Sequence, residues 1–223
     1  MLRASGAILF CGLIFHAGGA AATPIVDQSN VQPAPALAGD FVASNQFLAQ
    51  SFTVGIPGGL AEIDLELYNL TGASSGDDFL VKLLQGAPVD GSPLNFGVTL
   101  FASTIPFTSV PLVTPPLTAV TVAPHVAVVA GEVLTIVLEQ TGHAARNDVV
   151  WSSFLGPYAG GTTFFSADTL TWSLEGAEAG FQTWVEPPGI QSVPEPRSVA
   201  LLLTGIGCAF LRRGRRSATA STE

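Results

Sequence analysis

Residues 61–67 read AEIDLEL, an alternation of apolar and acidic residues. Because successive side chains of a β-strand point to opposite faces, Ile63, Leu65 and Leu67 would share one face and the three carboxylates the other. An alternation of this kind is typical of a half-buried strand. We therefore predict a strand here, with its leucine face against a core and an acidic outer face.

Similar short runs occur along the chain between Gln46 and Val185. They are residues 47–54, 79–84, 98–102, 119–122, 133–139, 149–154, 162–165, 170–174 and 181–185. Clusters of Gly, Pro, Asp and Ser separate them, as expected for turns. Residues 110–116 contain three prolines and are predicted as a loop or edge segment, because proline cannot donate to a central ladder. About ten short strands and no amphipathic helix predict an all-β fold, a single antiparallel β-sandwich.

The composition limits the classes of function. The 223-residue chain is 48% hydrophobic and 11% charged, which supports a folded core. From Thr23 to Pro196 it has 16 acidic residues and two basic ones, Lys82 and Arg146, a formal charge of −14. Such a charge repels phosphate backbones, so we expect no nucleic-acid partner. Both cysteines, at positions 11 and 208, lie outside this stretch, which excludes a disulfide or a cysteine zinc site within it.

The N-terminus has the three parts of a secretory signal peptide: a basic start, an apolar run at residues 7–15 and a small-residue exit. The apolar run is shorter than the about 20 residues that a membrane span needs. Ala20, Ala22 and Thr23 fit the small-x-small site of signal peptidase. We predict residues 1–22 as a signal helix that is removed; the alternative is a buried N-terminal strand or helix.

The C-terminus combines a proline-rich segment, an apolar run and a basic cluster. Residues 199–211 read VALLLTGIGCAFL, and a helix of this length would be about 20 Å long, shorter than the hydrocarbon core of about 30 Å. The basic residues that follow are Arg212, Arg213, Arg215 and Arg216. They would stay in the cytoplasm and leave the residues before Pro194 outside. The tail therefore predicts a transient stop in a membrane; the alternative is a helix packed on the domain.

This tail resembles the PEP-CTERM sorting signal of Gram-negative, exopolysaccharide-producing bacteria. The triplet Pro194, Glu195 and Pro196, the short apolar helix and the arginine cluster match that signal by type and spacing over residues 193–216. The resemblance implies that exosortase, a membrane protease-transpeptidase, recognises the tail and cleaves near the triplet. The protein would then be extracellular or at the cell surface.

These signals divide the chain into five parts. We predict a signal peptide at 1–22, a β-sandwich domain at 23–186, a proline-rich linker at 187–192, the sorting signal at 193–216 and a disordered tail at 217–223.

Several short motifs lie in the predicted domain. They are VDQS at 26–29, AQSFTV at 49–54, YAGG at 158–161, FQT at 181–183, and the tryptophans 151 and 172. The set resembles exported modules of unknown activity that carry interchangeable C-terminal anchors, the choice-of-anchor type. The resemblance implies a jelly-roll sandwich similar to carbohydrate-binding modules, and it brings no catalytic residues.

Aromatic side chains give the strongest binding signal, since flat rings stack on sugar faces. The set is Trp151, Tyr158, Trp172 and Trp184. We select Trp151, Tyr158 and Trp172 as candidate ligand-binding residues, with Tyr158 at the rim of a loop. The alternative is that Trp151 and Trp172 fill the core.

The carboxylates give weaker signals. Asp77 and Asp78 follow a Ser-Gly turn and could hold Ca²⁺, although no EF-hand spacing is present. Asp64 and Glu66 would lie about 7 Å apart on one strand face, wider than the about 5–5.5 Å of a retaining glycosidase, so we expect them to be solvated. His125 lies in a predicted loop, where a lone histidine is usually a surface residue. No P-loop, HExxH or Gly-x-Ser-x-Gly pattern occurs.

We therefore expect an exported, non-enzymatic structural or binding component of an exopolysaccharide or biofilm matrix, with no cofactor beyond, at most, calcium. Its expected partners are signal peptidase, exosortase and extracellular polysaccharide. One alternative is a carbohydrate-binding module assisted by calcium, and another is a secreted hydrolase. A hydrolase would need two convergent carboxylates in a cleft.

Overall fold

The computed structural model describes residues 23–31, 38–43, 46–71, 76–113, 119–142, 149–156, 158–167 and 170–188. All of them belong to one compact unit. The predicted terminal helices lie outside these residues, as do Ala20, Ala22, the Pro194-Glu195-Pro196 triplet and the arginine cluster. Within the described ranges, no helix has the length and apolar character of a membrane span.

The described residues form an all-β fold, as predicted. One short 3₁₀ helix, η1 (Phe107–Ser109), accompanies the strands. The strands are β1 (Ile25–Asn30), β2 (Gly39–Phe41), β3 (Phe47–Thr53), β4 (Gly58–Leu65), β5 (Leu67–Asn69), β6 (Phe79–Gln85), β7 (Thr99–Ile105), β8 (Val120–Val122), β9 (Val126–Val128), β10 (Val133–Gln140), β11 (Val149–Phe154), β12 (Thr163–Ser166), β13 (Ser173–Leu174), β14 (Glu178–Ala179) and β15 (Phe181–Glu186).

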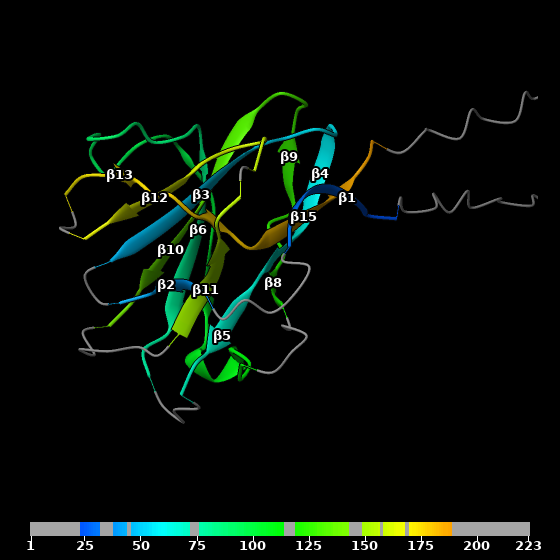
Figure 1. Ribbon diagram of the computed structural model, residues 1–223. Coiled ribbons are helices and arrows are strands. Elements are labelled where there is room, and N and C mark those ends of the chain that lie inside the picture. Colours follow the sequence, from blue (N-terminus) through cyan, green and yellow to red (C-terminus); the bar gives the residue numbers. More distant parts are fainter. Residues whose placement is uncertain are drawn as a thin grey trace, which may run out of the picture. The chain divides into compact units, whose positions relative to one another are not determined.

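The strands pair antiparallel in three sheets (Figure 1). The six-stranded sheet has the order β13-β12-β3-β10-β6-β7. The five-stranded sheet has the order β1-β15-β4-β8, and β9 also pairs with β4. The four-stranded sheet has the order β14-β11-β2, and β5 also pairs with β11. The sequence predicted one sandwich and did not indicate this division.

The two smaller sheets meet at a junction of three residues. The Glu66 amide donates to the Gly180 carbonyl at 3.0 Å, the Ser152 amide donates to the Glu66 carbonyl at 2.9 Å, and the Gly180 amide donates to the Ser152 carbonyl at 2.7 Å. At this point the chain leaves β4, which pairs with β15, and enters β5, which pairs with β11. The two sheets are therefore joined by backbone hydrogen bonds.

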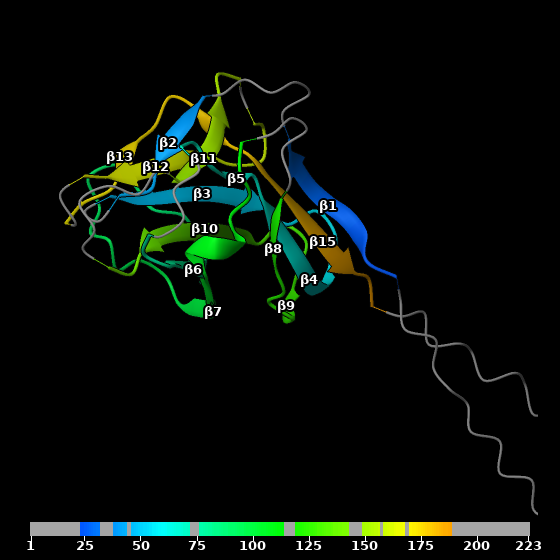
Figure 2. The same cartoon turned by 90° about the horizontal axis from the view of Figure 1, so that it is seen from below.

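The main core lies between the six-stranded sheet and the two smaller sheets. Leucine, isoleucine, valine and phenylalanine side chains from all three sheets form one buried cluster. Phe52 of β3 and Phe181 of β15 pack across it with ring centroids 5.7 Å apart. Figures 1 and 2 show β3, β10 and β6 side by side, and β1, β15 and β4 side by side as a separate group. Burial of these faces supplies most of the driving force for folding.

A second, smaller cluster covers the opposite face of the six-stranded sheet. Its buried members are Ala49, Leu84, Val137, Phe164 and Trp172. They alternate along the strands with residues of the main core, as the two-residue repeat of a strand requires. The six-stranded sheet is therefore packed on both faces, and β3 is buried along most of its length.

The stretch 61–67 is a strand, as predicted, but it ends at residue 65. Ile63, Leu65 and Leu67 all lie in the main core. Glu66 does not lie on an acidic outer face, since it is only 6% exposed. The prediction was wrong here because the chain changes strand partner at this residue.

The other predicted strands correspond to β3, β6, β7, β8, β10, β11, β12 and β15. Of residues 170–174, only Ser173 and Leu174 form a strand. The sequence missed β1, β2, β9 and β14. β2, β9 and β14 are too short for a periodic pattern, and β1 contains a bulge between Val26 and Gln28 that breaks its alternation.

Candidate functional site

The outer face of the five-stranded sheet, opposite the main core, carries an aromatic side chain. Along β15, residues Phe181, Thr183 and Val185 are buried, whereas Gln182, Trp184 and Glu186 point the other way. Trp184 is partly exposed, and the other two tryptophans of the chain are each only 1% exposed. Trp184 is therefore the one tryptophan that can contact a ligand without rearrangement.

The Asp64 carboxylate holds the Trp184 indole and is itself held by Thr121. Its Nε1 donates to Asp64 Oδ2 at 2.8 Å, and the Thr121 hydroxyl donates to Asp64 Oδ1 at 2.6 Å. In the ladder, Trp184 lies opposite Glu62, whereas Asp64 lies opposite Gln182. The hydrogen bond is thus diagonal, so the indole extends along the sheet surface across β4.

The surroundings of Trp184 are acidic. Glu62 is exposed directly across the ladder, and Glu186 is exposed two residues further along β15. The only lysine or arginine among the described residues is Lys82. It lies on β6 in the other layer and forms an ion pair with Glu139 at 2.9 Å. No described cation therefore offsets the carboxylates of this face.

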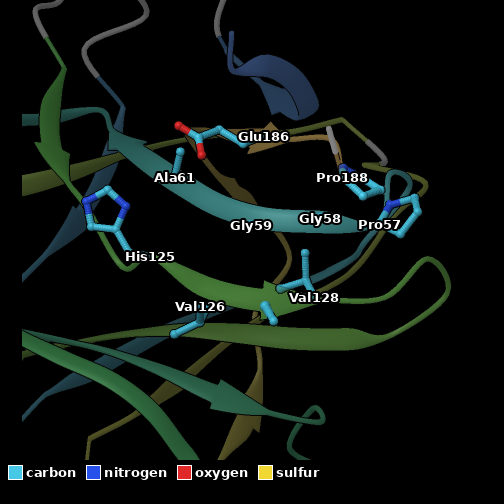
Figure 3. Close-up of a pocket in the computed structure, with 10 residues that line it drawn as sticks. Pro57, Gly58, Gly59, Ala61, His125, Val126, Val128, Glu186 and Pro188 are labelled. Atoms are coloured by element: carbon cyan, nitrogen blue, oxygen red, sulfur yellow. The ribbon is translucent and has the colours of Figure 1, made fainter. Parts of the chain in front are cut away.

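A hollow of about 580 Å³ lies at the Glu186 end of the same sheet (Figure 3). Three of its lining residues on β4, Gly58, Gly59 and Ala61, have no side chain or only a methyl group. Figure 3 shows the Glu186 carboxylate, the Ala61 methyl group and the His125 ring among the groups that line the hollow. A β-carbon at Gly58 would collide with the Glu186 carbonyl oxygen, but one at Gly59 would meet open space.

This surface combines three chemical features. The indole offers a flat apolar face, the carboxylates accept hydrogen bonds, and the hollow offers space beside small residues. Such an arrangement can hold a polar ligand that has one apolar face. Among the described residues there is no group of three or more His, Cys, Asp or Glu side chains that could hold a metal ion.

Comparison with known proteins gives no family. No family model matches the chain, and no curated protein matches it.

The three predicted ligand-binding residues do not come together. Trp151 lies in the main core, where its Nε1 donates to the Gly180 carbonyl at 2.9 Å. Trp172 lies in the second cluster, edge-on to Phe96 with ring centroids 6.0 Å apart. The tryptophans therefore fill two cores on opposite faces of the six-stranded sheet, which was the alternative interpretation.

Tyr158 joins the β11–β12 connection to the rest of the fold. Its hydroxyl donates to Gln28 Oε1 at 2.7 Å, and its ring packs edge-on against Phe181 at 5.4 Å. Burial, followed by the charges of Asp27 and Glu178, raises the pKa of its phenol well above the ordinary value of 10.0. These contacts indicate a structural role rather than a stacking role at a rim.

Asp77 and Asp78 accept hydrogen bonds from different elements. Asp78 Oδ1 accepts from the Phe107 amide at the start of η1 at 3.0 Å, and Asp77 Oδ2 accepts from Gln140 Nε2. The two carboxylates therefore link β6 to η1 and β10. Among the described residues, no third His, Cys, Asp or Glu side chain joins them in a group that could hold a metal ion.

The carboxylates of the stretch 61–67 also differ from expectation. We predicted that Asp64 and Glu66 would be solvated. Asp64 is partly buried between Trp184 and Thr121, and Glu66 is buried beside Gly180. The sequence alternation placed Asp64 correctly on the outer face, but the Trp184 contact comes from a strand 120 residues away.

Several residues of the sequence motifs cross-link strands. Asp27 accepts hydrogen bonds from the amides of Gly55 and Ile56 in the turn after β3. Gln50 of β3 is fully buried, and its Oε1 accepts from the Thr163 hydroxyl at 2.5 Å and from the Ala179 amide at 2.8 Å. These motif residues therefore stabilise the fold, and their contacts explain the motifs without a ligand.

A smaller hollow of about 260 Å³ lies over the second cluster. Phe47, Leu94 and Trp172 line it, and the Lys82–Glu139 ion pair lies at its edge. The Trp172 ring is only 1% exposed, so it offers little surface to a ligand in this hollow.

Proposed function

We propose that this chain is an exported, non-enzymatic module of jelly-roll type that serves as a structural or binding component of an extracellular polysaccharide matrix. Signal peptidase would create its N-terminus at Thr23. Exosortase would process its C-terminus near the Pro194-Glu195-Pro196 triplet after a transient stop in the inner membrane. The sequence signals at the two ends support the export route.

One strand pairing carries the proposal. Ile25 of β1 is the ladder partner of Val185 of β15. β1 begins two residues after the predicted signal-peptidase site, and β15 ends eight residues before Pro194. Cleavage at both predicted sites would therefore leave every described strand intact, as an exported and processed domain requires.

The sandwich part of the proposal rests on the packing. A buried cluster between the six-stranded sheet and the two joined smaller sheets supports a two-layer β-fold. Several paired antiparallel strands, such as β3 with β10 and β4 with β15, are distant in sequence. Such pairing supports a jelly-roll type of connection.

A second candidate function is a carbohydrate-binding module. The observation that favours it is the partly exposed indole of Trp184 among hydrogen-bond acceptors on the outer sheet face. Its site differs from the one that the sequence predicted, because Trp184 replaces Trp151 and Trp172.

The export route is tested by mass spectrometry of the protein collected from the culture and from the cell-associated matrix. We expect an N-terminus at Thr23 and a C-terminus near residues 194–196. A variant with all three triplet residues replaced by alanine should keep its tail and stay in the membrane fraction. An intact 223-residue chain in the cytoplasm would contradict the proposal.

The non-enzymatic role is tested on the same secreted protein. Incubation with the purified matrix polysaccharide should release no new reducing ends, and the protein should sediment with the matrix after a salt wash. Release of reducing ends in proportion to the amount of protein would support the hydrolase alternative instead.

A further inference from the structure

We propose that the outer face of the five-stranded sheet, from Trp184 to the hollow beside Gly59, binds a neutral polysaccharide by stacking a pyranose ring on the indole. The inference deepens the proposed function, since it rests on an extracellular matrix as the source of the ligand and names the site and the ligand class.

The first argument is the state of the indole. Trp184 is held by Asp64, and both Asp64 oxygens are engaged, one by Trp184 and one by Thr121. The ring is therefore ordered before a ligand arrives, which removes part of the entropy cost of binding. Because its N–H is already used within the protein, the ring offers its face rather than a hydrogen-bond donor. A sugar ring with axial hydrogens matches such a face.

The second argument is the supply of acceptors beside the ring. Glu62 lies directly opposite Trp184 on β4, and Glu186 lies about 7 Å further along β15, by the two-residue repeat of a strand. Both carboxylates are exposed. Sugar hydroxyl groups can donate to them, and hydrogen bonds to a charged acceptor are the stronger kind.

The third argument is space for the next sugar units. The hollow begins at Glu186 and is lined by Gly59, Ala61 and Ala127, which leave room for a polymer along the sheet. Gly58 is kept as glycine by its φ of 154° and by the Glu186 carbonyl. Gly59 has no such constraint, and a side chain at this position would enter the open space of the hollow.

The fourth argument is charge, which selects the class of polymer. Glu62, Asp64 and Glu186 lie on this face, and the only described Lys or Arg residue, Lys82, lies on the other layer. An acidic polysaccharide would be repelled, whereas a neutral one would not. We therefore commit to a neutral polymer.

The experiment uses the secreted protein and the exopolysaccharide of the producing strain, separated by anion exchange into neutral and acidic fractions. Affinity electrophoresis measures retardation by each fraction, with chitosan as a cationic probe. We expect retardation by the neutral fraction that persists at high salt. The inference would be overturned if neither fraction retarded the protein or if only the acidic fraction did. It would also be overturned if only chitosan retarded the protein and high salt removed that effect.

Matched variants locate the site. Trp184→Ala should weaken binding of the neutral fraction about tenfold or more, which corresponds to about 1.4 kcal/mol. Phe41→Ala is the control, because Phe41 is also aromatic, is 40% exposed and lies on the four-stranded sheet. Gly59→Val should weaken binding by filling the hollow, and Gly176→Val is its control at another glycine with open space. Equal affinity of Trp184→Ala and the wild type would overturn the site.

A fluorescence measurement separates a binding defect from misfolding. Trp184 is the only tryptophan that acrylamide can reach readily, because Trp151 and Trp172 are buried. The neutral fraction should protect wild-type fluorescence from quenching, and Gly59→Val should keep the unliganded quenching of the wild type. Binding without protection of Trp184 would overturn the site while leaving export and matrix location, tested by mass spectrometry and sedimentation, unaffected.

Discussion

At the scale of single residues, the two tyrosines show how burial changes a side chain's chemistry. Tyr158 is packed against Phe181 and hydrogen-bonded to Gln28, and Tyr68 is buried in β5. Desolvation raises the pKa of both phenols above the ordinary value of 10.0, and nearby carboxylates raise them further. Each phenol is therefore neutral in the folded protein where a free tyrosine would begin to ionise.

This predicts a delayed alkaline titration. Because the folded-state pKa values exceed the unfolded value of about 10, the two phenols contribute stability that is complete below pH 10 and lost as the pH rises through the folded values. Tyrosinate absorbance of the folded protein should stay low near pH 10 and rise in denaturant at the same pH. Half-ionisation of both tyrosines near pH 10 in the folded protein would contradict this.

At the scale of elements, buried polar contacts connect strands that the hydrophobic pattern alone would not align. Gln50 of β3 contacts Thr163 of β12 and Glu178 and Ala179 of β14. The six-stranded sheet is linked in this way to the four-stranded sheet. Such contacts favour one arrangement of the strands, because a shift of one residue would leave these buried groups without partners.

Removal of this link should destabilise the fold. Gln50→Leu removes the hydrogen bonds that Gln50 Oε1 accepts from the Thr163 hydroxyl and the Ala179 amide, and the amide keeps only its longer contact with the Thr163 hydroxyl at 3.2 Å. Each such hydrogen bond contributes about 0.5–1.5 kcal/mol net. Urea unfolding should show a lower midpoint with little change in slope. Gln85→Leu is the control, because the Gln85 contact with Glu132 is exposed and should matter little. Equal stability of the two variants would contradict the role of the link.

The junction of the smaller sheets predicts a second effect. A β-carbon at Gly180 would collide with the carboxylate of Glu66, which is buried beside it. Gly180→Ala should therefore destabilise the protein by about 1–3 kcal/mol, as overpacking does. Gly176→Ala has open space and should be nearly neutral in the same thermal unfolding experiment. A neutral Gly180→Ala would show that Glu66 can move aside at little cost.

At the scale of the described body, its first and last strands are neighbours. β1 pairs with β15 from Ile25 to Asn30, and β15 pairs on its other side with β4. The first described strand, β1, is thus an edge strand of the five-stranded sheet, and its neighbour β15 is the last described strand. Neither end can be removed without exposing the strand beside it.

This proximity predicts that the body tolerates circular permutation. A chain in which Pro188 is joined to Thr23 by a short Gly-Ser linker and opened at the exposed Gly176 should fold, since the new bond spans two adjacent strands. Circular dichroism and thermal unfolding should match those of the linear chain.

Deletion of residues 25–30 should instead abolish cooperative unfolding, and a stable deletion variant would contradict the role of β1.

Much of the fold was predictable, and the site was not. The longer strands were found because alternation is a local property of the chain. The break at Glu66 was missed because it depends on Gly180 and Ser152, which are distant in sequence. Trp151 and Trp172 could not be distinguished from Trp184 by sequence, because an aromatic residue in a strand is compatible with either face.

The sequence by itself determined the all-β class and the acidic, cysteine-free composition of the body, since composition and two-residue periodicity are properties of the chain alone. The two terminal signals stay predictions. Only the tertiary structure decided that Trp184 lies partly exposed beside Asp64, while Trp151 and Trp172 are buried in separate clusters. The physical reason is that exposure and hydrogen-bond partners depend on which strands pair, and the chain brings those strands together from positions more than 100 residues apart.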